Sequence, residues 1–372
     1  MRIGVPKEIK NHEYRVAVTP DGVRQLVAAH HTVLVEHNCG AAIGFSDDAY
    51  RAAGASVSDN PKTVFAESEL IVKVKEPQPV ECAWLTSEHT LFTYLHLAPD
   101  ATLTQKLLDS GCIAIAYETL SEDGHSLPLL APMSQVAGRL ASQVGAHYLQ
   151  ATCGGRGVLL GGVDGAQPGQ VLVLGGGMVG SNAVDVALGM GAAVTLVDSQ
   201  DSVLQRCQAR WPALQLINSS RQPIDDAVAA ADLLVGAVLV AGGRAPQVVS
   251  EAMVRRMQPG SVIVDVAIDQ GGCIASSRPT SHEQPVFVAH GVTHYCVSNM
   301  PSAAAWTATQ ALTRATLPYV LQLANSGIDS ALQHSAALRR GANIWRGRLV
   351  NPAVADAQQR DAVALVDLLP AR

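Results

Sequence analysis

The stretch from Val171 to Asp198, VLVLGGGMVGSNAVDVALGMGAAVTLVD, constrains the fold of this chain more than any other. An apolar β-branched run leads into the pattern Gly175-x-Gly177-x-x-Gly180, and an Ala-rich helical pattern and a second β-branched run follow it. In a strand-turn-helix unit, three glycines at this spacing serve the tight turn, the close approach of a pyrophosphate and the packing of helix on strand. The stretch therefore predicts a βαβ unit that binds a dinucleotide.

The second strand of this unit ends in an acid, Asp198, eighteen positions after Gly180. A carboxylate there reaches the hydroxyls of the adenosine ribose and repels a 2′-phosphate. The pyrophosphate is favoured at the helix N-terminus by unpaired N–H groups and by the helix dipole. A glycine-rich turn can also be purely structural, but here strand, helix and acid are all in register. The predicted cofactor is NAD rather than NADP.

Composition indicates a two-domain α/β enzyme of the cytoplasm. With 372 residues, the chain exceeds what one hydrophobic core usually organises. A net charge of -6 without a basic stripe argues against a nucleic-acid partner. The N-terminus has no apolar signal segment, and the longest apolar stretch, near 233–240, is too short to cross a membrane. The seven scattered cysteines suggest free thiols in a reducing compartment, and no residue cluster indicates a metal.

Strand-like apolar runs alternate with helical patterns along the chain, which predicts parallel sheets covered by helices. In the first part we expect strands at 2–5, 32–36, 70–74, 90–94 and 113–117, and helices at 20–29, 62–67 and 100–110. Further on we expect a long helix at 132–150, strands at 171–174, 194–197, 233–239, 261–268 and 286–289, and a helix at 303–324 interrupted at Pro318. The first part has no GxGxxG of its own, so we expect it to hold the substrate.

Eight segments resemble those of alanine dehydrogenases, in the same order and over essentially the whole chain. They are MRIGVPKEIKNHEYRVAVTP at the start, VKVKEP at 72–77, TYLHLA at 93–98, APMSQVAGRLA, GGRGVLLGG, VLGGGMVG, VDVAIDQGG at 264–272 and HYCVSNMPS at 294–302. The resemblance implies NAD-dependent, reversible oxidative deamination of L-alanine to pyruvate and ammonia, in homo-oligomers that are commonly hexamers.

The resemblance also implies a domain organisation. It consists of two doubly wound, Rossmann-like α/β domains with a cleft between them. The substrate domain is discontinuous, at 1–130 and 304–372, and the NAD-binding domain lies at 131–303. The C-terminal helices are expected to return and pack on the first domain.

Two cations in matched segments suit an amino-acid substrate. Arg15 has the planar fork that binds a carboxylate in bidentate fashion. The alternative for Arg15 is a surface arginine that pairs with Glu13. Lys75 follows a strand-like run, where a lysine would bind the carboxylate or the oxygen that develops at Cα. Lys73 is the competing candidate, and only the resemblance favours Lys75.

Proton transfer requires a group that titrates near neutral pH, and His96 follows the strand predicted at 90–94. Ligands of open α/β sheets bind beyond the carboxyl ends of the strands. Asp269 is expected to close the strand at 261–268 and to assist His96, whereas Asp265 within that strand is expected to be structural. In the implied reaction, hydride passes from Cα to nicotinamide C4, and His96 and Asp269 serve the addition of water to the imine.

By the same resemblance, the NAD site combines the glycine loop with positions spread over the second domain. These positions are Ser134, Gly175, Gly177, Met178, Val179, Gly180, Asp198, Ser220, Leu239, Ile268, Arg278, Asn299 and Met300. Two alternatives stay open: a noncatalytic NAD-sensing protein, and a transhydrogenase-type nucleotide-binding subunit that needs a membrane partner. Arg15, Lys75 and His96 together favour an amino-acid substrate, because a nucleotide-only module has no carboxylate to bind.

Overall fold

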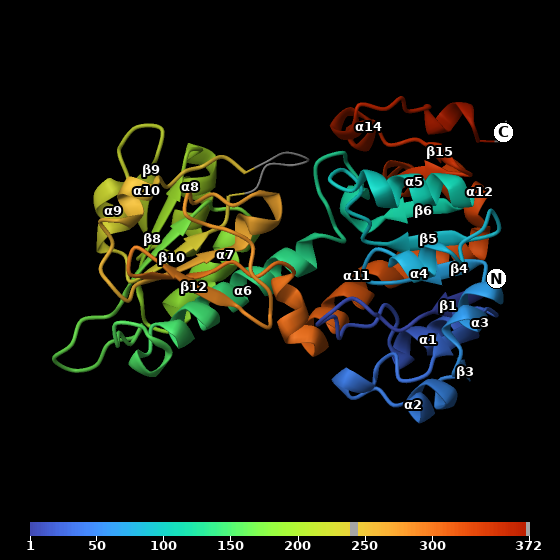
Figure 1. The fold of residues 1–372 in the computed structure, drawn as a ribbon, viewed down its shortest axis with the longest axis horizontal. Helices are drawn as coiled ribbons and strands as arrows, with labels where there is room; N and C mark the ends of the chain where they lie inside the picture. Colours follow the sequence, from blue (N-terminus) through green and yellow to red (C-terminus); the bar gives the residue numbers. More distant parts are fainter. Residues whose placement is uncertain (239–244, 370–372) are drawn as a thin grey trace. The chain divides into compact units, whose positions relative to one another are not determined.

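The computed structural model describes residues 1–238 and 245–369 (Figure 1). The chain divides into two compact units. Unit 1 comprises Met1–Met133 and Ala305–Arg372, and unit 2 comprises Ser134–Ala304. The chain passes from unit 1 to unit 2 within helix α6 (Ala131–Tyr148) and returns where helix α11 (Ala305–Ser326) begins. Unit 1 is therefore built from two separate stretches of sequence.

Unit 1 contains, among its described residues, an eight-stranded sheet of order β15-β14-β6-β5-β4-β1-β2-β3. Its strands are β1 (Arg2–Val5), β2 (Thr32–Glu36), β3 (Ser56–Ser58), β4 (Leu70–Val72), β5 (Thr90–Thr93), β6 (Ile113–Ala116), β14 (Ala342–Trp345) and β15 (Arg348–Leu349). β1 to β6 pair in parallel, and β14 pairs antiparallel with both β6 and β15. A mixed sheet with an antiparallel edge is common in doubly wound folds.

Helices of unit 1 connect the strands and complete the C-terminal part. Besides α11 they are α1 (Pro20–Ala28), α2 (Asp47–Ala52), α3 (Pro61–Ala66), α4 (Pro79–Cys82), α5 (Ala101–Ser110), α12 (Ile328–His334), α13 (Ala336–Gly341) and α14 (Pro352–Gln358), with 3-10 turns η1 (Ala41–Ile43), η2 (Tyr117–Thr119) and η6 (Leu365–Asp367). Their starts follow from local chemistry. Thr19 caps α1 and Asp100 caps α5, each with its side-chain oxygen.

The C-terminal helices belong to unit 1, but three details of this unit differ from the expectations. The C-terminal part returns with strands as well as helices, because β14 extends the sheet beyond β6. The strand expected at 70–74 ends at Val72, since the main-chain N–H of Val74 donates to Glu8. Pro318 does not interrupt α11. The helix buries Leu312 and Leu323 on either side of the proline, and this packing offsets the lost hydrogen bond.

Unit 2 contains, within the described residues, a seven-stranded sheet of order β12-β13-β11-β10-β7-β8-β9. Its strands are β7 (Gln170–Leu174), β8 (Ala193–Asp198), β9 (Gln215–Asn218), β10 (Leu233–Gly236), β11 (Val262–Asp265), β12 (Val286–Ala289) and β13 (Val292–Tyr295). Its helices are α6, α7 (Met178–Gly189), α8 (Asp201–Arg210), α9 (Asp225–Ala230) and α10 (Glu251–Val254), with 3-10 turns η3 (Ala151–Cys153), η4 (Val266–Gln270) and η5 (Met300–Ala304). Only β12 pairs antiparallel with its neighbour.

The strand expected at 261–268 is shorter than predicted, and the reason is visible in its last residue. β11 ends at Asp265, whose buried carboxylate accepts the main-chain N–H groups of Cys273 and Ile274. These bonds fold the following segment back toward the strand end. Asp269 therefore lies in the 3-10 turn η4 and not at the end of a strand. Asp265 is structural, as expected.

The apolar runs predicted as strands are buried on both faces. Val171 and Val173 pack into one hydrophobic cluster, whereas Leu172 and Leu174 pack into another. Alternate residues of a strand point to opposite faces, so the helices cover both sides of this sheet. The prediction of a doubly wound α/β fold is confirmed.

The parallel strands of both sheets follow the same order. If the parallel strands of each unit are numbered in chain order, their order across the sheet is 3-2-1-4-5-6. The strand order therefore reverses between β1 and β4 in unit 1, and between β7 and β10 in unit 2. Open α/β sheets bind ligands outside the carboxyl ends of the strands at this reversal. The fold thus marks one candidate ligand position in each unit.

Candidate functional site

The proposed substrate residues of unit 1 follow neighbouring strands at the reversal of strand order. Arg15 lies in the segment after β1, Lys75 follows β4, and His96 follows β5. The carboxyl ends of parallel strands lie at one edge of a sheet, so the three segments meet there. The charges of Arg15 and Lys75 lie close enough to interact.

Arg15 is buried and does not lie on the surface. Its Nε donates to Glu13 Oε1 at 2.7 Å and its Nη2 to Glu13 Oε2 at 2.5 Å, while Nη1 contacts the sulfur of Met133 at 3.0 Å. Only 2% of Arg15 is exposed. Burial by itself lowers the pKa of Arg15, but the hydrogen bonds and charge of Glu13 raise it above the usual value. A guanidinium kept charged inside the protein is a group that can bind a carboxylate.

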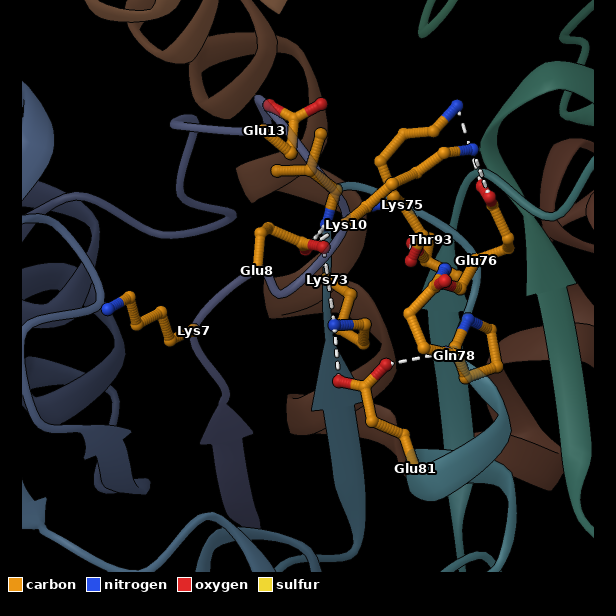
Figure 2. Close-up of polar contacts among 12 residues, drawn as sticks. Lys7, Glu8, Lys10, Glu13, Lys73, Lys75, Glu76, Gln78, Glu81 and Thr93 are labelled. Atoms are coloured by element: carbon orange, nitrogen blue, oxygen red, sulfur yellow. Dashed lines mark hydrogen bonds and ion pairs between the residues drawn. The ribbon is translucent and has the colours of Figure 1, made fainter.

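Lys73 belongs to a buried ion-pair cluster. Its Nζ lies 2.7 Å from Glu81 Oε1 and 3.3 Å from Glu8 Oε2. Figure 2 shows Lys73 between these two carboxylates. Lys73 is fully buried, and the two carboxylates raise its pKa although burial alone would lower it. An ammonium paired with two buried carboxylates has a structural role, because most of its hydrogen-bond donors are already used and few remain for a ligand. This geometry favours Lys75 over Lys73 as the substrate-binding lysine.

The ammonium of Lys75 is also buried, but it is weakly paired. Lys75 is 7% exposed, and among the described residues its only ion pair is with Glu76 Oε2 at 3.5 Å. Its main chain is fixed more firmly, because its N–H donates to Glu8 and its carbonyl accepts the Thr93 hydroxyl at 2.8 Å. Burial lowers the pKa of Lys75. A buried ammonium with one long ion pair keeps donors for an anion or a carbonyl oxygen.

His96 is exposed, and its backbone is held in an unusual conformation. Its φ of +50° lies in the left-handed region, and its N–H donates to Glu118 Oε1 at 2.6 Å. The imidazole stacks on Tyr94 with 5.8 Å between ring centroids. The Tyr94 hydroxyl in turn donates to the carbonyl of Leu129 at 2.5 Å. Strained backbone of this kind persists where surrounding contacts fix it, often at functional sites.

The glycine loop of unit 2 has the geometry that its sequence predicts. Gly175 has a φ of +94°, which favours glycine at this turn. A Cβ on Gly180 would lie 1.8 Å from the carbonyl oxygen of Gly175, so helix and strand leave no room for a side chain. A Cβ on Gly177 would meet nothing within 4 Å. Gly177 is the N-cap of α7 and provides no side-chain cap, which suits the approach of a pyrophosphate.

Asp198 is anchored beside this loop. Its Oδ2 accepts the main-chain N–H of Gly176 at 2.8 Å, and its Oδ1 accepts that of Gln200 at 2.9 Å. The carboxylate at the end of β8 thus stands next to the turn that follows β7. This is the place where an acid contacts a ribose in dinucleotide-binding folds.

We expect Gly180→Ala to destabilise unit 2 by more than about 2 kcal/mol, because the new methyl group overlaps a carbonyl that the loop cannot move. Gly189→Ala in the same helix is the matched control, since its Cβ would enter open space. That variant is expected to stay within about 1 kcal/mol of the wild type. Urea denaturation of both variants measures the difference. Equal stability of the two would contradict the close packing described for Gly180.

The other nucleotide-site candidates lie at several places in unit 2, and Leu239 lies outside the described residues. Ser220 follows β9, Ile268 and Asp269 lie in η4, Asn299 and Met300 follow β13, Ser134 lies in α6, Met178 and Val179 begin α7, and Arg278 precedes β12. Asp269 is exposed and Ile268 is buried. The guanidinium of Arg278 lies over the ring of Phe287, 4.4 Å from its centroid.

A cavity of about 670 Å³ opens at the N-terminal end of α7. It is lined by Gln135, Arg139, Gly177, Met178, Ser181, Asn182, Arg206 and Arg210. The sequence analysis missed its arginines, of which Arg206 donates to the carbonyl of Gly176 at 3.1 Å. Arginines beside an uncapped helix N-terminus favour phosphate groups.

The sequence analysis also missed the acidic partners in unit 1. Glu118 fixes the backbone of His96, and Glu8 fixes that of Lys75. Glu8 lies in the first matched segment, and Glu118 directly follows a predicted strand. Both could therefore have been found from their positions in the sequence. Within residues 1–238 and 245–369, no group of three or more His, Cys, Asp or Glu residues is arranged to hold a metal ion. No helix in this part of the chain is long and apolar enough to cross a membrane.

Comparison with known proteins gives matches over both units. Residues 4–137 match the family described as "Alanine dehydrogenase/PNT, N-terminal domain", and residues 141–352 match its C-terminal domain. The chain is 50% identical over 370 residues to an alanine dehydrogenase of Halomonas elongata, which covers 99% of this chain and 100% of that protein. It is 51% identical to an alanine dehydrogenase of Bacillus subtilis, over 95% of this chain and 94% of the relative.

Solved structures agree with these matches. A structure of an L-alanine dehydrogenase is 50% identical, with a TM-score of 0.93 over 96% of this chain and 99% of that one. A transhydrogenase from Sinorhizobium meliloti has a TM-score of 0.81 at 21% identity, over 95% of this chain and 100% of that one. The second likeness indicates a common fold.

Proposed function

This chain belongs to the alanine dehydrogenase/PNT family, and we propose that it catalyses the NAD-dependent, reversible oxidative deamination of L-alanine to pyruvate and ammonia. One observation in unit 1 carries the proposal. The buried, weakly paired ammonium of Lys75 lies close enough to the buried guanidinium of Arg15 for their charges to interact, at the reversal of strand order. Two buried cations at a ligand position suit a small carboxylate.

The residues of unit 2 fit the cofactor NAD. The open approach to Gly177 and the missing side-chain cap of α7 suit a pyrophosphate, and Asp198 suits a ribose diol. When bound, NAD supplies the nicotinamide that accepts the hydride from Cα. We propose that the other positions named above for the nucleotide site, Leu239 among them, contribute the remaining contacts.

In the proposed mechanism, the residues of unit 1 bind and orient the substrate. Arg15 binds the carboxylate through its guanidinium, and Lys75 binds the carboxylate or the oxygen at Cα. The ammonium group of alanine first loses a proton, and departure of hydride from Cα then leaves an iminium ion, the protonated imine. His96 accepts a proton from the water that attacks the imine carbon, and Asp269 assists. His96 returns this proton to the carbinolamine nitrogen and accepts the hydroxyl proton as ammonia leaves and pyruvate forms. Orientation and proton transfer are thus the protein's contribution.

Measuring NADH formation by absorbance tests this proposal. The enzyme is expected to reduce NAD with L-alanine, and rates with glycine, L-serine and L-2-aminobutyrate measure its selectivity. With pyruvate and ammonia it should oxidise NADH. A protein that binds NAD but yields no NADH with any amino acid would instead be a nucleotide-binding protein without this activity.

The assignment of Asp198 predicts a change in cofactor preference. Asp198→Ala is expected to raise the KM for NAD and to narrow the preference over NADP, because the variant neither holds the ribose hydroxyls nor repels a 2′-phosphate. Turnover at saturating NAD should change much less. Asp198→Asn separates the lost charge from loosening of the Gly176 turn, and Asp201→Ala is a nearby surface control. Wild-type enzyme that uses NADP as well as NAD would contradict the assignment.

We also propose that the protein acts in amino-acid catabolism in the cytoplasm and as a homo-oligomer, a hexamer in view of its family. Exposed apolar side chains support a subunit contact. Leu159 and Val163, on the glycine-rich segment before β7, are 66% and 65% exposed. Apolar surface of this kind often marks an interface. Light scattering of the purified protein measures the number of subunits.

A further inference from the structure

The Glu76 carboxylate lies between two ammonium groups, which Figure 2 shows approaching it together. Glu76 Oε1 accepts a short hydrogen bond from Lys10 Nζ, and Glu76 Oε2 lies 3.5 Å from Lys75 Nζ. The Glu76 side chain is only 15% exposed. The mostly buried carboxylate of Glu76 thus contacts two lysines, and its contact with Lys10 is the closer one.

The three residues come from two of the matched segments, which meet at the reversal of strand order. Lys10 follows β1, whereas Lys75 and Glu76 follow β4, and these strands are paired neighbours. Glu8, also after β1, accepts the main-chain N–H of Lys75. The segment after β1 therefore fixes both the backbone of Lys75 and the carboxylate beside its side chain.

We propose that Lys10 is a positioning residue of the substrate site, which holds Glu76 so that the Lys75 ammonium stays available to the substrate carboxylate. The inference rests on the proposed function, and it concerns a residue that neither the resemblance nor the motif assigns. Without Lys10, the Glu76 carboxylate would form its ion pair with Lys75 alone. The substrate would then have to compete with a carboxylate of the protein.

The direction of the pH effect follows from the charges that face Lys75. These are Glu76, Lys10, Arg15 and Glu13, with Glu8 at its main chain. Burial lowers the pKa of Lys75, and the positive charges of Lys10 and Arg15 lower it further, whereas Glu76 raises it. Removal of Lys10 takes away a positive charge and strengthens the pair with Glu76, so both changes raise the pKa of Lys75. Removal of the Glu76 charge lowers it.

The test compares Lys10→Met with Lys7→Met. Lys7 lies on the same segment but is exposed and points away from the cluster in Figure 2. In Lys10→Met, the KM for pyruvate is expected to rise roughly two- to ten-fold, as for one lost ion pair of a half-buried cluster. The kcat and the KM for NADH should not change. Lys10→Arg should restore most of the affinity, and Lys7→Met should behave like the wild type.

The pH profile of kcat/KM for pyruvate distinguishes a positioning role of Lys10 from a purely structural one, because loss of a structural residue would not shift the profile in the way expected here. Binding requires the protonated ammonium, so it is lost as the pH rises through the pKa of Lys75. This alkaline limb is expected to move to higher pH in Lys10→Met and to lower pH in Glu76→Gln. An unchanged KM and limb in folded Lys10→Met, or shifts of the limb in the opposite directions, would overturn the inference. A wild type without activity on pyruvate would instead overturn the proposed function.

Discussion

The His96→Ala variant is expected to deaminate L-alanine about 10²- to 10⁴-fold more slowly than the wild type, the usual contribution of a positioned acid-base group. The reason is that addition of water to the imine loses its proton acceptor. The KM for NAD should stay close to the wild-type value, since His96 belongs to unit 1 and the nucleotide residues to unit 2. Steady-state kinetics with varied alanine and varied NAD measures both effects.

His30→Ala is a matched control, because His30 is exposed in the same unit and has a similar backbone conformation, with a φ of +64°. It should retain full activity. His96→Ala and His30→Ala should also have similar stability, since both remove an exposed side chain. A fully active His96→Ala enzyme would remove this residue from the proton-transfer role.

Arg15→Ala is expected to lose both stability and substrate affinity. The substitution removes the guanidinium from a buried ion pair with Glu13, and breaking a buried ion pair in this way typically costs about 3–5 kcal/mol. Arg15→Lys should recover little, because a point charge does not replace the two parallel bonds to Glu13. Urea denaturation and the KM for pyruvate measure the two losses.

A double variant separates these two effects. Replacing both partners with apolar residues, in Arg15→Met with Glu13→Leu, removes both buried charges and should restore much of the stability. The KM for pyruvate should stay high, because the carboxylate still lacks its guanidinium. If the double variant bound pyruvate as the wild type does, Arg15 would have a structural role alone.

Local patterns predicted most of the architecture. The segment 171–198 folds as a strand, a glycine turn, a helix and a second strand, because each part depends on neighbours in the sequence. β1, β2 and β12 have the predicted bounds for the same reason. Sequence patterns failed where distant residues decide. β14 forms a strand because β6 offers it a partner, and β11 stops at Asp265 because that carboxylate binds Cys273 and Ile274.

The sequence allowed us to predict which residues form the candidate site, but not which side chains pair with one another. Chemistry and motifs pointed to Arg15, Lys75 and His96, whose positions after strands place them at one edge of a sheet. No periodicity shows that Glu13 occupies one edge of the Arg15 guanidinium, or that Lys73 has two carboxylates and Lys75 a distant one. These pairings arise from side chains that fold together from separate loops, and they determine which cation remains available.

The split sequence of unit 1 affects the order in which a growing chain can fold. Unit 2 is one continuous stretch, so all of it has been synthesised before the last part of unit 1 leaves the ribosome. Until residues 342–345 emerge, β6 is an open sheet edge, and such edges invite pairing with other chains. The nascent protein therefore carries an aggregation-prone edge for the whole time that unit 2 is being made, and a message truncated before codon 342 would leave that edge exposed permanently.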